Sequence, residues 1–116
     1  MRIFLVQPDD SLAREMCAEM DEIGFVAVRI ESDDADTIRE LAQDRPNAVL
    51  VCLDSGRGVA AALDLAEGLS ARRRLRGVPL VFAGGKQAAL TAAQERFPRA
   101  SFARRDVIYN LLSSLR

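Results

Sequence analysis

The sequence predicts an α/β protein in which helices cover both faces of a parallel sheet. Five short apolar runs alternate with five helical patterns at a spacing of about 20 to 25 residues, which is typical of strand–helix units that build a parallel sheet. The run Val49-Leu50-Val51 has no polar alternation, as expected of a central strand covered on both faces. With 116 residues, 49% hydrophobic and 28% charged, the chain fits one globular domain, which we expect to span residues 1–116.

Each expected strand is a short apolar segment bounded by polar or turn-forming residues. The segments are Arg2–Val6, Val26–Ile30, Ala48–Leu53, Leu80–Ala83 and a less apolar fifth at Ser101–Arg104.

The first helix is expected to begin near Asp10 or Ser11, because either side chain can accept a hydrogen bond from the first turn. It should end at Gly24, which tolerates left-handed backbone geometry. Its inner face is marked by apolar residues at helical spacing, namely Leu12, Met16, Met20 and Ile23.

The second helix is expected to be capped by Asp33 or Asp34. It must stop before Pro46, because a proline pushes the preceding residue out of helical geometry. The remaining helices are expected at Val59–Leu75, Gln87–Phe97 and Val107–Leu115. Each of these helices has an apolar inner face. The second helix carries Ile38, Leu41 and Ala42 there, and the third carries Val59, Leu63, Ala66 and Leu69. The fourth carries Leu90, Ala93 and Phe97, and the fifth carries Ile108, Leu111, Leu112 and Leu115.

Composition excludes several classes of chemistry. The chain has no histidine, which removes the commonest general base, the imidazole metal ligand and every Ser/His or Cys/His pair. Cys17 and Cys52 lie in apolar contexts and are expected to be free thiols. The net charge of −1 supplies no field that attracts nucleic acid. Met1–Val6 leads straight into polar residues, unlike a signal peptide, and no run approaches the ~20 apolar residues of a membrane span, so we expect a cytoplasmic protein.

A more specific pattern lies around the third strand, where a proline, a polar residue and four apolar residues precede Cys52. Together with the order of the segments, the stretch Pro46–Leu53 resembles the CheY-like receiver domain of bacterial response regulators, over nearly the whole chain. Further landmarks are the polar residues after Arg2–Val6, the fourth strand within Val78–Phe82, and Phe102 three residues before Arg105. The resemblance implies a doubly wound, flavodoxin-like (βα)5 three-layer sandwich with strand order 2-1-3-4-5.

The chain departs from the receiver pattern wherever that family carries its chemistry. In the family, acidic residues after the first strand and an acceptor aspartate bind Mg²⁺, a Thr or Ser ends the fourth strand, and a lysine follows the fifth. The matching positions here are Gln7, Pro8, Cys52, Gly84 and Arg105. A thiol is a poor ligand for Mg²⁺ and cannot form an acyl phosphate. The sequence therefore predicts a pseudo-receiver that needs no cofactor and signals by protein contact rather than by enzymatic or phosphoryl chemistry.

Three alternatives remain open at this stage. Asp9, Asp10 and Asp54 lie at the same sheet edge and could form a displaced Mg²⁺ site for a phosphorelay, although Asp10 also fits a helix cap and Asp54 a turn with Ser55-Gly56. Cys52 could act as a redox-sensing thiol activated by Arg105. The crevice at the sheet edge is also where open α/β sheets place small ligands.

By the same resemblance, a protein partner or a second copy would dock on the face formed by the fourth helix, fifth strand and fifth helix. The candidate residues on that face are Leu90, Gln94, Phe102, Arg104, Arg105 and Tyr109. The basic group Arg72-Arg73-Arg74 with Arg76 is interpreted as a solvated helix end that complements the helix dipole, and not as a nucleic-acid site. Gly84-Gly85-Lys86 is interpreted as a turn that needs glycine rather than as an anion cradle.

Overall fold

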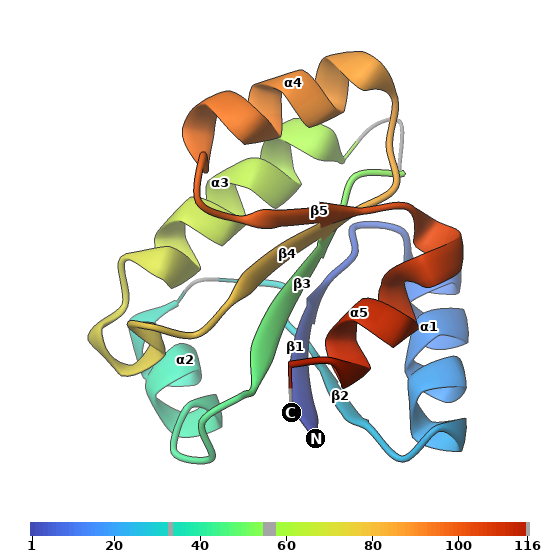
Figure 1. Cartoon of the computed structure of the whole chain (residues 1–116). Helices are drawn as coiled ribbons and strands as arrows, with labels where there is room; N and C mark the ends of the chain where they lie inside the picture. The colour runs from blue at the N-terminus through green and yellow to red at the C-terminus, as the bar shows by residue number, and fades with distance from the viewer. Residues whose placement is uncertain (33, 55–57, 116) are drawn as a thin grey trace.

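Five parallel strands form one sheet in the order β2-β1-β3-β4-β5 in the computed structural model, which describes residues 1–32, 34–54 and 58–115 (Figure 1). The strands are β1 (Arg2–Val6), β2 (Val26–Arg29), β3 (Ala48–Cys52), β4 (Leu80–Ala83) and β5 (Ser101–Ala103). The helices are α1 (Asp10–Glu22), α2 (Ala35–Leu41), α3 (Val59–Ser70), α4 (Gln87–Arg96) and α5 (Ile108–Ser113), with 3₁₀ helices η1 (Arg73–Leu75) and η2 (Arg105–Val107). The predicted fold class and strand order are confirmed.

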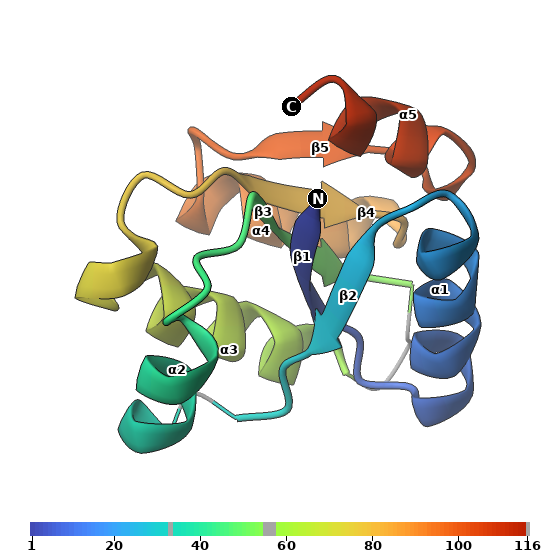
Figure 2. The ribbon, with the colours of Figure 1, turned by 90° about the horizontal axis from the view of Figure 1, so that it is seen from below.

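Helices cover the sheet on both faces, so the molecule has three layers (Figure 2). Alternate residues of β1 point to opposite sides: Ile3 packs in a core with α1 and α5, and Phe4 in a core with α2, α3 and α4. Every residue of β3 is buried. This two-sided burial explains why the strands read as continuous apolar runs in the sequence. None of the described helices is long and apolar enough to cross a membrane.

The first helix begins at Asp10 and is ended by Gly24 with φ +86°, as predicted, but its cap and one inner-face residue differ from the prediction. Asp9, rather than Asp10 or Ser11, is the N-cap, and its carboxylate accepts a hydrogen bond from the Leu12 amide at 2.9 Å. Ile23 was predicted on the inner face, but it is the C-cap residue and is 46% exposed. Because α1 ends at Glu22, the chain leaves the helical path before Ile23 can reach the core.

The third helix is shorter than predicted, because α3 ends at Ser70 and a separate 3₁₀ turn carries Arg73–Leu75. Leu75 explains the break. In a continued helix it would lie about 240° around the axis from Leu69, since each residue turns about 100°. The break lets both residues enter the core, where Leu69 is 1% and Leu75 is 4% exposed. Arg73 and Arg74 therefore lie on a 3₁₀ turn that Leu75 anchors in the core, and not on the last turn of α3.

The remaining boundaries agree with the predictions to within a residue or two. α2 is capped by Asp34, whose carboxylate accepts a hydrogen bond from the Thr37 amide at 3.1 Å. Asp33, the other predicted cap, and the predicted Ser55-Gly56 turn lie outside the described residues. α5 begins one residue after the predicted start, following η2.

β4 leads into a turn of two glycines, both with left-handed backbone. Gly84 has φ +72° and Gly85 φ +91°, and a Cβ on Gly85 would lie 2.7 Å from the Cβ of Leu53. The prediction that this segment needs glycine is confirmed. The close approach holds the loop after β4 against the loop after β3.

Substituting alanine at two glycines should separate backbone strain from crowding. Gly24→Ala meets nothing within 4 Å at φ +86°, so we expect it to lower the free energy of unfolding by about 1–2 kcal/mol from the left-handed backbone alone. Gly85→Ala adds overpacking, and the expected loss is about 2–5 kcal/mol. Urea denaturation of both variants measures the difference, and equal losses would contradict the packing described for Gly85.

Candidate functional site

The loops after β1, β3, β4 and β5 meet at the carboxyl edge of the sheet. Gln7 follows β1 and is a polar side chain that is only 2% exposed. Its Nε2 donates a hydrogen bond to Asp54 Oδ1 at 3.0 Å, and its Oε1 accepts one from the Asp9 amide at 3.1 Å. These bonds satisfy an amide that would otherwise be costly to bury, and they tie the loop after β1 to the loop after β3.

Asp54 is also joined to the start of the last helical segment. Its Oδ2 accepts a hydrogen bond from Arg105 Nη1 at 2.7 Å, and the two side chains are only 24% and 29% exposed. On the other side of Arg105, Nη2 lies 3.7 Å from Glu19 Oε1, and the Tyr109 hydroxyl donates to the same oxygen at 3.0 Å. We call these five residues, Gln7, Asp54, Arg105, Glu19 and Tyr109, the Asp54 network.

The charges of the Asp54 network hold two of its members in their protonated forms. Burial works against the charge of Arg105, but the attraction of Asp54, smaller contributions from Cys52 and Tyr109, and the hydrogen bond to Asp54 together outweigh burial and raise the pKa of the guanidinium. Burial, together with the hydrogen bond to Glu19 and its negative charge, raises the pKa of Tyr109. Both shifts favour the donor states that the hydrogen bonds require.

Cys52 ends β3 directly beneath this network and is 1% exposed. Its Sγ lies 3.6 Å from Met16 Sδ. Burial, followed by the negative charge of Asp54, raises the pKa of the thiol to about 12. The residue is therefore a protonated thiol in an apolar environment, whereas a reactive cysteine needs an exposed thiolate.

Gly84 lies in tight contact with Asp54. A Cβ at this position would lie 3.1 Å from the Cβ of Asp54. The structure therefore places four of the predicted degenerate positions around Asp54, which was predicted for the alternative Mg²⁺ site. These four are Gln7, Cys52, Gly84 and Arg105. Pro8, the fifth, lines the neighbouring crevice, which Gln7 also lines.

The three predicted acidic residues do not converge. Asp9 caps α1, Asp10 is paired with Arg29 at 2.6 Å, and Asp54 belongs to its own network. Among the residues that the structure describes, no group of three or more His, Cys, Asp or Glu side chains could hold a metal ion. Mg²⁺ requires several oxygen ligands in near-octahedral geometry. An amide, a proline, a thiol and one carboxylate that is already paired do not fit that requirement.

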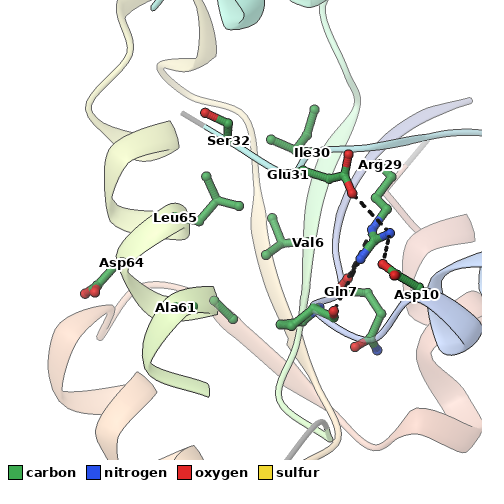
Figure 3. Close-up of a pocket in the computed structure, with 12 residues that line it drawn as sticks. Val6, Gln7, Asp10, Arg29, Ile30, Glu31, Ser32, Ala61, Asp64 and Leu65 are labelled. Atoms are coloured by element: carbon green, nitrogen blue, oxygen red, sulfur yellow. Dashed lines mark hydrogen bonds and ion pairs between the residues drawn. The ribbon is translucent and has the colours of Figure 1, made fainter. Parts of the chain in front are cut away.

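A crevice of about 610 Å³ lies beside the Asp54 network, between the ends of β1 and β2 and helix α3 (Figure 3). Arg29 forms one wall, and its guanidinium donates to the Gln7 carbonyl at 2.7 Å and pairs with Asp10 and with Glu31, the latter at 3.3 Å. The opposite side is formed by α3, which contributes Ala61 and Leu65 together with the carboxylate Asp64. Since every polar contact of Arg29 is internal, the guanidinium braces the loops after β1 and β2.

Sequence reasoning did not identify Arg29 or Glu19 as site residues. A charged residue at the carboxyl end of a predicted strand is a signal that could have indicated Arg29, because that end faces the crevice. Glu19 had no such signal, since its partner Tyr109 is 90 residues away.

The predicted docking residues differ in burial and in the side of the sheet that they pack against. Leu90 and Phe102 pack against the core on the α2–α3–α4 side, where the Phe102 ring stacks on Phe82 at 5.3 Å. Tyr109 packs against the core on the other side and bonds to Glu19 of α1. Gln94 and Arg104 are exposed. Tyr109 thus belongs to the seam between α1 and α5.

The strand order and the two helical layers define a doubly wound, flavodoxin-like protein. More narrowly, the chain has the CheY-like receiver fold. A receiver domain from Methylobacillus flagellatus superposes with a TM-score of 0.72 at 18% identity, covering 100% of this chain and 98% of that one. The Vibrio cholerae chemotaxis protein CheY4 also gives 0.72, at 5% identity, covering 99% and 98% of the two chains.

A third similar structure is the receiver domain of a sensor histidine kinase from Pseudomonas aeruginosa, which holds a magnesium ion in its active-site cleft. It superposes with a TM-score of 0.66 at 16% identity and covers 98% of this chain and 95% of that chain. No family model and no curated protein matches the sequence.

The single tyrosine reports directly on the Asp54 network. The chain has one tyrosine and no tryptophan, so near-ultraviolet absorbance during an alkaline titration follows Tyr109. We expect it to ionise above its ordinary pKa in the folded protein. Glu19→Gln should lower that pKa, because it removes the carboxylate that opposes the tyrosinate. The exposed residue Glu22 on the same helix supplies the control, and an equal response to Glu22→Gln would contradict the assigned contact.

Cys52 should be inert in the folded protein. In a Cys17→Ser variant at about pH 8, we expect iodoacetamide to modify Cys52 only after unfolding in about 8 M urea, as read by intact mass. The folded thiol has a pKa raised from 9.0 to about 12, so the folded state holds this proton more tightly. The associated stability is complete below about pH 9 and is lost as the pH rises toward 12. Rapid labelling of the native protein would contradict the burial described here.

Proposed function

We propose that this protein is a receiver-type signalling domain that acts through protein contacts and is not switched by aspartyl phosphorylation. The setting that this implies is bacterial two-component signalling in the cytoplasm, with no enzymatic activity of its own. The receiver fold supports the general class. The side chains at the carboxyl edge of the sheet support the statement that aspartyl phosphorylation does not switch it.

The observation that carries the proposal is that Asp54 has both carboxylate oxygens engaged by side chains of the same chain. Oδ1 accepts from Gln7 and Oδ2 from Arg105. The position that matches the acceptor aspartate is the buried thiol Cys52. A carboxylate paired in this way is compensated in charge and is not available as a metal ligand or a nucleophile toward a phosphoryl donor.

The Asp54–Arg105 ion pair also supports a single resting conformation. It joins the loop after β3 to η2, and Arg105 reaches Glu19 of α1. By the resemblance to receiver domains, the fourth helix, fifth strand and fifth helix form the face on which a partner would dock. Here an internal ion pair already links the loop after β3 to η2, which leads into α5, so this end of the docking face would be presented without an activating step.

On the face formed by α4, β5 and α5, a partner could contact only the predicted residues that are exposed to solvent. Gln94 on α4 and Arg104 after β5 are exposed, while Leu90 is half-buried at their side. Phe102 supports β5 from within by stacking on Phe82. A protein partner, or a second copy, would therefore meet a mostly polar surface with little apolar area.

The competing phosphorelay function rests on Asp54, which does lie at the carboxyl edge. Incubation with Mg²⁺ and acetyl phosphate, followed by intact mass spectrometry, tests it. We expect no phosphoryl adduct, because the Asp54 carboxylate is already bonded by Gln7 and Arg105. A receiver domain with an intact acceptor aspartate, treated in parallel, shows that the reagent is active.

Two variants complete this experiment. Arg105→Ala releases one oxygen of Asp54, and Asp54→Asn removes the carboxylate at nearly constant volume. A stoichiometric adduct on the unmodified protein that is lost in Asp54→Asn would overturn the proposal in favour of the relay. An adduct that forms only in Arg105→Ala would support it, since the ion pair would then be what keeps the carboxylate unreactive.

A further inference from the structure

We propose that this chain associates head to tail with a second copy of itself, through two complementary surfaces away from the Asp54 network. One surface is the η1–α4 groove, lined by Leu75, Arg76, Val78, Phe97 and Arg99 among others. The other is the α1–β2 corner, formed by Asp21, Glu22, Ile23 and Val26. The inference goes beyond the proposed function and does not depend on it.

The η1–α4 groove is an apolar depression of about 550 Å³ at the amino-terminal edge of the sheet. Its walls are packed into the core, because Leu75 is only 4% exposed and the Phe97 ring packs on Phe82 with 5.2 Å between ring centroids. The Val78 amide donates to the Leu75 carbonyl at 3.1 Å, which closes the turn on one side. A preformed apolar groove of this kind can receive small aliphatic side chains without rearrangement.

The rim of the groove is basic and uncompensated. Arg76 and Arg99 line it, and Arg73 and Arg74 lie on the adjoining turn. All four are exposed, and none forms an ion pair with any residue in the described ranges. Arg45 adds a fifth guanidinium, whose Nη2 donates to the Arg76 carbonyl at 2.6 Å. The groove therefore combines an apolar floor with unpaired positive charge, which suits an acidic partner with apolar side chains.

The α1–β2 corner has the opposite character. Ile23 is 46% and Val26 56% exposed, and they are two of the three large apolar residues that are exposed in the described part of the chain. Asp21 and Glu22 precede them, are exposed, and pair with no described cation. Two exposed aliphatic side chains beside two free carboxylates match the groove in both polarity and charge.

The two surfaces lie on opposite sides of the molecule, so one copy can use both at once. η1 and the turn between α1 and β2 are separated by the sheet in both ribbon views (Figures 1 and 2). An interface between two different patches of identical chains is heterologous, and it extends into rings or filaments rather than stopping at a symmetric dimer. We expect weak association, with a dissociation constant on the order of 0.1 mM, since a four-residue corner buries far less than the ~800 Å² per partner of a stable interface.

A second copy is favoured over other occupants because both halves of the contact are present in this one sequence. Nucleic acid would need exposed aromatic side chains for stacking, whereas Phe97 is half-buried in the groove wall. An acidic segment of another protein has the chemistry that the groove accepts, and it is an outcome that the test distinguishes.

Sedimentation velocity of the full chain from about 10 µM to about 1 mM tests the proposal. We expect the mean mass to rise with concentration, and association to weaken about threefold or more between about 0.1 M and about 0.5 M salt, because exposed charges are screened. The groove variant Arg76→Glu with Arg99→Glu, and the corner variant Ile23→Ser with Val26→Thr, should each remain monomeric. Their mixture should form dimers that grow no further, because only one intact pair of surfaces remains.

Two further variants guard against a nonspecific effect of charge. Arg14→Glu with Arg39→Glu makes the same change in net charge on other surfaces and should leave the association intact. Adding Asp21→Lys and Glu22→Lys to the groove variant reverses the charge of both the groove and the corner, so this variant should associate again. A wild-type chain that stays monomeric at about 1 mM would overturn the proposal. So would association that survives in both the groove and the corner variants, or a monomer that instead binds a poly-glutamate peptide through Arg76 and Arg99.

Discussion

The structure depends on burying both faces of the central strands β1 and β3. Ile3 and Phe4 enter different cores on opposite sides of the sheet, and every residue of β3 is covered. Because neither face is solvated, polar side chains can gather only where the strands end. Parallel strands end at the same edge, so the loops after β1, β3, β4 and β5 bring their polar residues together there. The location of the candidate site thus follows from how the apolar residues are packed.

At that edge the polar groups satisfy one another instead of leaving ligands free. Asp54 is the centre, with Gln7 on one oxygen and Arg105 on the other. Free carboxylates at this edge would repel one another unless a cation were bound between them. Here the guanidinium of Arg105 supplies the positive charge. The negative charge of the partly buried Asp54 carboxylate is thus compensated by the side chain of Arg105. The consequence is an internal link between the sheet edge and the last helical segment.

Part of this site could be predicted from the sequence. The matches at Gln7, Cys52, Gly84 and Arg105 lie together as the receiver pattern implies, because strand order and strand ends are encoded by apolar runs and turn residues. The displaced acidic site was a reasonable hypothesis at the same edge, but its members have separate partners. Asp9 instead caps α1, and Asp10 forms an ion pair with Arg29 at the end of β2. Proximity along an edge does not decide which side chains converge.

The sequence by itself determined the fold class, the strand order through its resemblance, and the absence of acidic residues at the positions that match the receiver pattern, because these depend on apolar periodicity and residue identity. Only the tertiary structure decided that Leu75 ends the third helix early, that Ile23 is exposed, and that Asp54 is bound by Arg105, 51 residues away. The reason is physical. A periodic pattern depends on near neighbours along the chain, whereas a side chain's final partner depends on which distant residues the folded sheet brings within bonding distance.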